Sequence, residues 1–184
     1  RTQEIERLVA RSLRAAVDLE ELGPIALNVD CDILNADGGT RCASITAANL
    51  ALRLGVRRLI AAGICLPKNM RPTEEQRRSG WSPPALSEEE QMAHEMRVME
   101  HDVAAISVGL IDGKSYLDLD SNLDSNADVD MNVVKVSNGA FVEVQGTGEE
   151  STYQRQELDA LLDMADIGFE ALFEMQKTIL HGQQ

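Results

Sequence analysis

The stretch Asp30-Cys31-Asp32-Ile33-Leu34-Asn35-Ala36-Asp37-Gly38-Gly39-Thr40-Arg41 predicts a passage from a strand into a helix. Ile25 to Leu34 alternate as a half-buried strand does, and Thr40 to Gly63 have the pattern of a long helix. Gly38 and Gly39 permit a close backbone approach, and the first N–H groups of a helix lack intrahelical partners. The stretch therefore predicts an oxyanion site, to which Thr40 contributes a hydroxyl donor and Arg41 a guanidinium that can bind two phosphate oxygens at once. An ordinary strand–turn–helix connection remains the alternative.

A second motif is the acidic run Asp118-Leu119-Asp120-Ser121-Asn122-Leu123-Asp124-Ser125-Asn126-Ala127-Asp128-Val129-Asp130-Met131-Asn132. Carboxylates this close repel one another, so the run indicates a bound cation, a nearby arginine or a solvated loop. An EF-hand loop starting at Asp118 fails, because position six is Leu123 instead of Gly and position twelve is Val129 instead of Glu. Two alternatives stay open: a solvated acidic turn, or carboxylates that hold Mg²⁺ beside a phosphate.

The remaining pattern alternates helices and strands. A helix is expected from the N-terminus to just before Gly23-Pro24, and the apolar run Val103–Ile111 is typical of a buried strand. Asp112-Gly113 and Asn138-Gly139 are hairpin signals. A final helix is expected from Arg155 to Leu180, with one apolar face formed by Leu158, Leu161, Leu162, Ala165, Phe169, Leu172, Phe173 and Gln176.

The stretch from Leu66 to Asp102 has a different composition. Its first part, 71–84, is polar and rich in proline, which predicts a loop anchored by Trp81. Ser87 and Glu90 form a capping box that starts a helix reaching about Glu100. Met92, Met96 and Met99 are expected on its inner face, and the three histidines of the chain are expected at the surface.

Composition points to a globular protein of the cytoplasm. The 184 residues suit one domain, and 43% hydrophobic residues are enough for a core. No apolar run approaches the roughly twenty residues that cross a bilayer. Three cysteines without Cys-x-x-Cys spacing favour a reducing compartment, and Cys42 is interpreted as a buried structural thiol although Arg41 beside it could lower its pKa. These observations predict a cytoplasmic protein with no membrane partner.

The net charge of −14 has the wrong sign for a self-sufficient RNA-binding protein, since affinity for nucleic acid rests on Lys and Arg. Arg7, Arg11 and Arg14 share one helix face, which offers a local cationic stripe. That stripe suits an RNA or subunit contact as well as it suits a solvated face paired with neighbouring Glu residues.

Taken together, the motifs resemble the ribonuclease PH family of phosphate-dependent 3′ exoribonucleases. The resemblance rests on both runs quoted above and on Val103-Ala104-Ala105-Ile106-Ser107-Val108-Gly109, Asp130-Met131-Asn132-Val133-Val134 and Val142-Glu143-Val144-Gln145-Gly146-Thr147. It implies an α/β fold (α+β), a mixed sheet backed by helices in the left-handed βαβ superfamily. It also implies phosphorolytic trimming of precursor tRNA 3′ ends with release of nucleoside diphosphates, and a role in tRNA and rRNA processing as a nucleotidyltransferase in a hexameric homo-oligomer ring.

The resemblance also assigns roles to residues. Arg1, Gly39, Thr40 and Arg41 match positions that bind phosphate, the co-substrate, and Asp124 and Asp130 match the two catalytic aspartates that hold Mg²⁺ or relay a proton. The alternative is a non-catalytic, exosome-like ring subunit that scaffolds RNA. Two departures are expected: 1–184 is a single domain lacking the family's N-terminal strands, and residues 66–102 are a loop–helix insertion.

Overall fold

The computed structural model describes residues 2–148 and 151–182. The helices are α1 (Thr2–Ala16), α2 (Leu19–Leu22), α3 (Thr40–Ala61), the 3-10 turn η1 (Lys68–Met70), α4 (Glu74–Arg78), α5 (Glu88–Val98), α6 (Ser121–Asp124) and α7 (Arg155–His181). The strands are β1 (Val103–Ile111), β2 (Lys114–Leu117), β3 (Val129–Val136) and β4 (Phe141–Gly148). No helix among these residues is both long and apolar enough to pass through a bilayer.

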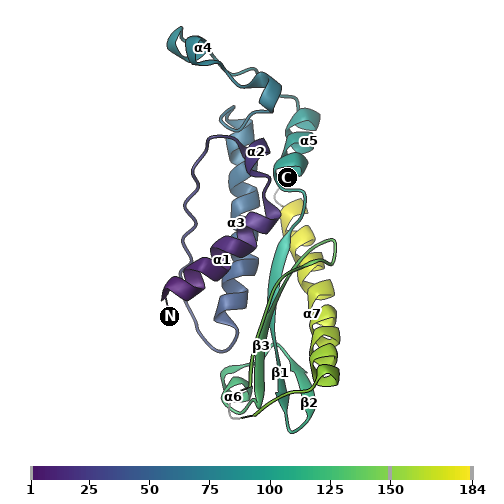
Figure 1. Cartoon of the computed structure of the whole chain (residues 1–184). Helices are drawn as coiled ribbons and strands as arrows, with labels where there is room; N and C mark the ends of the chain where they lie inside the picture. Colours follow the sequence, from purple (N-terminus) through teal and green to yellow (C-terminus); the bar gives the residue numbers. More distant parts are fainter. Residues whose placement is uncertain (1, 149–150, 183–184) are drawn as a thin grey trace.

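The four strands form one sheet in the order β2-β1-β3-β4, covered by helices on both faces (Figure 1). The predicted α/β fold is confirmed, and every strand pairing that the structure describes is antiparallel. Both predicted hairpins are present. Asp112 and Gly113 have φ of 50° and 73°, as the turn between β1 and β2 requires, and Gly139 has φ of 90° between β3 and β4.

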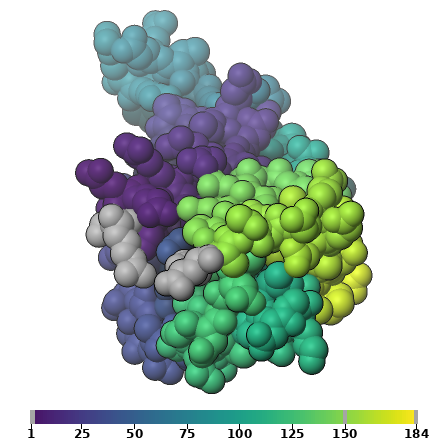
Figure 2. All heavy atoms as spheres, turned by 60° about the horizontal axis from the view of Figure 1, so that its bottom comes forward, coloured from purple at the N-terminus to yellow at the C-terminus, as the bar shows by residue number. Residues whose placement is uncertain are grey.

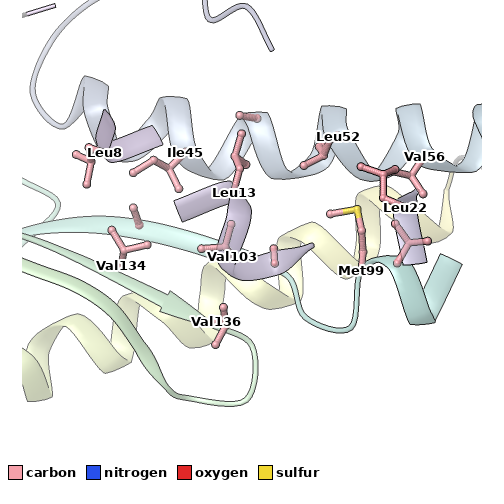
Figure 3. Close-up of a cluster of buried hydrophobic side chains, with 14 of the residues drawn as sticks. Leu8, Leu13, Leu22, Ile45, Leu52, Val56, Met99, Val103, Val134 and Val136 are labelled. Atoms are coloured by element: carbon pink, nitrogen blue, oxygen red, sulfur yellow. The ribbon is translucent and has the colours of Figure 1, made fainter. Parts of the chain in front are cut away.

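Alternate residues of β1 and β3 enter two separate cores. Val103, Ala105, Val134 and Val136 face the helices α1 and α3, where Ile45 and Val56 are fully buried (Figure 3). On the opposite face, β-sheet side chains pack on the predicted stripe of α7, including Leu161, Ala165 and Phe169. Successive side chains of a strand point to opposite faces of the sheet, and helices cover both faces here. This explains why every residue of β1 from Val103 to Leu110 is buried.

The strand predicted for Ile25 to Leu34 is wrong, because these residues have no regular secondary structure. Ile25 and Leu27 still pack against the α1/α3 core, whereas Val29, Ile33 and Leu34 are exposed. The segment runs alongside α3 in Figure 1, apart from the sheet. Alternation predicts which side chains face inward, but a strand also needs a neighbouring strand to hydrogen-bond, and the structure describes none here.

The first helix also differs from expectation, because α1 ends at Ala16 and a second short helix follows. Asp18 starts α2, since its carboxylate accepts hydrogen bonds from the N–H groups of Glu20 and Glu21. These hydrogen bonds lower the pKa of Asp18, and the bond from the N–H of Glu21 has the largest effect.

The segment 66–102 contains more structure than the sequence predicted. A five-residue helix, α4, starts within the expected loop, because Thr73 and Gln76 form a capping box. The predicted helix after Ser87 is confirmed as α5, with its capping box intact. Of the three methionines expected on its inner face, Met99 is buried just after the helix, but Met92 and Met96 are exposed, so their predicted inward orientation is wrong.

The inner face of α5 is polar instead of methionine-rich. His94, expected at the surface, is fully buried, and Glu95 is buried against two arginines of α3. Arg53 donates to Glu95 at 3.0 Å and Arg57 donates to it at 2.7 Å. A buried carboxylate needs such partners, and they tie α5 to the long helix.

Candidate functional site

The two motifs meet at Gly38. A Cβ atom at this position would lie 1.8 Å from the carbonyl oxygen of Leu119 and 2.9 Å from the carbonyl carbon of Asp120. Only glycine permits this approach of two backbone segments. The turn that starts α3 is therefore packed directly on the acidic run, although the two are about eighty residues apart in the sequence. Figure 2 shows these segments, blue and green, side by side on one face.

Gly39 occupies the left-handed region, with φ of 63°, at the N-cap of α3. Its ideal Cβ position is 3.4 Å from the hydroxyl oxygen of Ser107 and 3.7 Å from a carboxylate oxygen of Asp118. The helix that it starts has 22 residues, and no side chain caps its N-terminus. The first N–H groups of α3 therefore point to the junction of the two motifs, where an anion would be favoured.

Ser107 and Asn132 are the residues of the sheet that contact the two motifs at this junction. They are directly opposite each other on β1 and β3, and Gly109 is opposite Asp130 two pairs further along. The Ser107 hydroxyl accepts a hydrogen bond from the N–H of Leu119 at 3.1 Å. The Cys42 thiol donates to the side-chain oxygen of Asn132 at 2.9 Å, which anchors the first turn of α3 on β3.

Cys42 is buried, as the sequence predicted. Burial, with a smaller contribution from the negative charge of Asp130, raises the pKa of its thiol to about 12, although the positive charge of Arg41 acts in the opposite direction. The thiol is therefore protonated at neutral pH, which suits a hydrogen-bond donor and excludes a thiolate nucleophile. The charge of Asp118 also contributes to raising the pKa of this buried thiol.

Thr40 and Arg41 occupy the first turn of α3, and both are half-buried. One guanidinium nitrogen of Arg41 lies 3.9 Å from a carboxylate oxygen of Glu4 on α1. This separation is too long for a hydrogen bond, so the guanidinium keeps donors for another anion. Arg1 lies outside the described residues.

Asp124 and Asp130 flank the junction in different ways. Asp124 is the exposed last residue of the one-turn helix α6, and its N–H donates to the carbonyl oxygen of Asp120 at 2.8 Å. Asp130 is half-buried in β3 and makes interactions within the protein. Across residues 2–148 and 151–182, no three His, Cys, Asp or Glu side chains are grouped to hold a metal ion. Two carboxylates still match Mg²⁺, which takes its other ligands from water and substrate phosphates.

Asp37 and Asp120 hold α6 in place. Asp120 accepts hydrogen bonds from the N–H groups of Asn122 at 3.0 Å and Leu123 at 2.8 Å. Asp37, from the other motif, accepts one from the N–H of Ser121 at 2.7 Å. The sequence interpretation did not single out Asp37, Ser107 or Asn132. Asp37 adjoins Gly38 in the quoted run, but no pattern in the sequence indicates its distant partner.

The cationic stripe of α1 is partly neutralised. Arg11 forms an ion pair with Glu143 of β4, and with Arg7 it lines a small hollow of about 410 Å³. A larger hollow of about 730 Å³ lies between α1 and residues 25–31, and apolar side chains dominate its lining. Of the predicted phosphate-binding and catalytic residues that the structure describes, none lines either hollow.

Family models match two parts of the chain. The 3′ exoribonuclease family, domain 1, matches residues 1–55, and the 3′ exoribonuclease family, domain 2, matches residues 101–168. Each match contains one of the two motifs that meet at Gly38.

Curated relatives include proteins named ribonuclease PH. Those of Corynebacterium efficiens and Syntrophomonas wolfei are each 44% identical over 180 residues, and that of Corynebacterium diphtheriae is 46% identical over the same length. The alignments cover 98% of this chain but only 62–63% of the relatives. The chain thus spans less than two thirds of their length.

Similar solved structures support the fold. Rice (Oryza sativa) Rrp46 has a TM-score of 0.60 at 12% identity, over 98% of this chain and 66% of the other. The Archaeoglobus fulgidus exosome with RNA bound to the active site has a TM-score of 0.51 at 19% identity, over 88% of this chain and 56% of the other.

Proposed function

We propose, from the premise that this chain belongs to the ribonuclease PH family of 3′ exoribonucleases, that its protein shortens RNA from the 3′ end by phosphorolysis. In this reaction an oxygen of inorganic phosphate attacks the phosphorus of the last phosphodiester. The bond from that phosphorus to the 3′ oxygen of the preceding nucleotide breaks, and the terminal nucleotide leaves as a nucleoside diphosphate. The observation that carries the proposal is the contact of Gly38 with Leu119, which brings the turn at the start of α3 against the acidic run.

Inorganic phosphate is proposed to bind at the start of α3. The N–H groups of the first turn and the hydroxyl of Thr40 donate hydrogen bonds, and Arg41 supplies a two-pronged charged donor. Arg1 is proposed as a further phosphate ligand from its match to the family. When phosphate is held in line with the scissile bond, the entropic part of the activation barrier is lower, because the two reactants no longer have to meet and orient in solution.

Asp124 and Asp130 are proposed as the catalytic carboxylates. Their donor set fits Mg²⁺, which when bound would neutralise charge that develops on the phosphate oxygens and the leaving oxygen. The leaving 3′ oxygen also needs a proton, and an aspartate at this junction could relay it. Neither role requires a nucleophilic side chain, in agreement with the protonated Cys42 thiol.

The substrate is proposed to be precursor tRNA with a 3′ extension, processed in the cytoplasm by a hexameric ring of this protein. An RNA-bound exosome is among the proteins of similar fold. The net charge of −14 means that RNA must be held by local cationic residues, and Arg7 and Arg14 of the α1 stripe are exposed. Action on precursor rRNA is proposed on the same chemical grounds.

The test is phosphorolysis by the whole protein that carries this chain. A tRNA with a short 3′ extension should release nucleoside diphosphates only when phosphate is present. Asp124→Asn and Asp130→Asn should each lower kcat by about two orders of magnitude or more, because each removes a negative charge at constant volume.

Asp120→Asn is the matched control. Asparagine keeps the oxygen that caps α6, so turnover should remain close to that of the wild type. If Asp130→Asn turned over normally, the acidic run would be a solvated turn and not part of the catalytic site. Binding of RNA without any phosphate-dependent release would instead favour a non-catalytic ring subunit.

A further inference from the structure

We propose that Asp37 is a positioning residue that holds α6, and through it Asp124, against the phosphate-binding turn. This inference rests on the proposed function, since it concerns the placement of Asp124 relative to Thr40 and Arg41. It concerns a contact between the two motifs and not a contact with substrate.

The contact is a hydrogen bond from a backbone donor to a carboxylate. The N–H of Ser121 donates to Asp37 Oδ1 at 2.7 Å. Hydrogen bonds to an ionised acceptor are short and about twice as strong as neutral ones. Ser121 is the first residue of α6, where the N–H has no partner within the helix. Asp120 caps the next two N–H groups, which leaves that of Ser121 for Asp37.

The helix α6 depends on such contacts because its own packing is slight. It has four residues, and none of them is buried. A single helical turn is not stable by itself, and the apolar residue of this one, Leu123, is only half-buried. Asp124, at its end, is exposed. The buried residues Leu119 and Ala127 anchor the chain on either side of the helix. Between them, Asp37 and Asp120 hold the first turn, three residues before Asp124.

Asp37 is well placed for this task. It directly precedes Gly38, whose backbone packs on the carbonyl of Leu119, so the carboxylate comes from a segment that the fold already fixes. The turn itself does not depend on Asp37, because Cys42 anchors the start of α3 to Asn132. Loss of the Asp37 side chain should therefore displace Asp124 and leave the phosphate ligands in place.

The kinetic consequence is selective. A displacement of about 1 Å at a reacting group costs up to about a hundredfold in rate, so Asp37→Ala should lower kcat by about tenfold or more. The KM for phosphate should stay within about twofold, because Thr40 and Arg41 remain on α3. Asp37→Asn keeps an oxygen at the same position and should restore kcat to within about threefold of wild type. Asp32→Ala, an exposed carboxylate without a hydrogen bond to any described residue, should change neither constant.

A double-mutant cycle in the whole protein decides between positioning and direct action. If Asp37 acts through Asp124, adding Asp37→Ala to Asp124→Asn should lower the residual rate by less than about twofold. A further tenfold loss in the double variant would mean that Asp37 acts independently. Equal losses for Asp37→Ala and Asp37→Asn would mean that its charge acts directly. An unchanged kcat for Asp37→Ala would overturn the proposal outright.

Hydrogen exchange gives a readout independent of activity. In Asp37→Ala the amides of residues 120–125 should exchange at least about tenfold faster, and Asp37→Asn should largely restore their protection. Unchanged exchange in Asp37→Ala would refute the contact even in a protein with no phosphorolysis. A protein with the expected exchange but no phosphate-dependent release would keep the contact and refute the proposed function alone.

Discussion

Replacing Gly38 with Ala tests the contact on which the candidate site depends. The added Cβ would lie 1.8 Å from the carbonyl oxygen and 2.8 Å from the carbonyl carbon of Leu119, whereas real Cβ contacts essentially never fall below 3.0 Å. The two segments must therefore separate by about 1.2 Å or distort. All three nearest atoms belong to the backbone, so no side-chain rotation relieves the overlap. The backbone of Gly38 is outside the left-handed region, so strain in φ does not contribute.

The expected loss follows from that displacement. A shift of about 1 Å between the phosphate turn and the acidic run should lower kcat by between about tenfold and a hundredfold. Overpacking should also lower the free energy of unfolding by about 1–3 kcal/mol. Phosphorolysis of a 3′-extended tRNA by the whole protein gives kcat, and denaturant unfolding gives the stability. The rate must be measured well below the melting temperature, so that the two effects are separated.

Gly55→Ala is the matched control within the same helix. A Cβ there meets no atom within 4 Å, so the substitution should raise helix stability by up to about 1 kcal/mol and leave kcat unchanged. If Gly38→Ala folds stably and its kcat stays within about twofold of wild type, close approach of the two motifs is not required. The reasoning from Gly38 to the site would then be wrong.

Three other predictions follow from the structure. Arg41→Ala should raise the KM for phosphate more than it lowers kcat, since it removes binding common to ground state and transition state; steady-state kinetics at varied phosphate would contradict this if only kcat fell. Ser87→Ala should destabilise α5 by about 1 kcal/mol, because it removes the cap that accepts from the N–H of Glu90, and denaturant unfolding measures it. Burial lowers the pKa of His94 below its ordinary 6.5, so the unfolded chain takes up the proton first and stability falls as the pH drops below 6.5. His94→Gln should make the free energy of unfolding less dependent on pH between pH 7 and 5. An unchanged pH dependence would mean that His94 is not the group responsible.

Local chemistry made several elements predictable from sequence. The capping box of Ser87 starts α5 because its hydrogen bonds join residues three apart. Asp112-Gly113 closes a hairpin because both residues tolerate positive φ. The β1 strand is predictable because a run that is apolar on both faces must be covered on both. Each of these signals is complete within about ten residues of sequence.

The sequence predictions were wrong where an element depends on a partner that is distant in the sequence. Ile25 to Leu34 alternate as a strand does, but alternation does not supply a neighbouring strand. The sequence predicted His94 at the surface and Met96 inside, but His94 is buried and Met96 is exposed. The polar face of α5 packs against α3, where two arginines donate hydrogen bonds to Glu95. Helical periodicity gives the faces of a helix, but the side chains on the opposing element decide which face is buried.

The residue types of the site and their order can be read from the amino-acid sequence alone: a glycine turn that begins a helix, and a run of carboxylates further along. The family resemblance added their proposed roles. Three contacts follow from the three-dimensional fold: Gly38 lies on the backbone of Leu119, the Ser107 hydroxyl accepts from the N–H of Leu119, and Asp37 accepts from the N–H of Ser121. The physical reason is that backbone contacts and single hydrogen bonds between residues some eighty positions apart leave no periodic trace in the chain, because they depend on how the sheet brings α3 and α6 together.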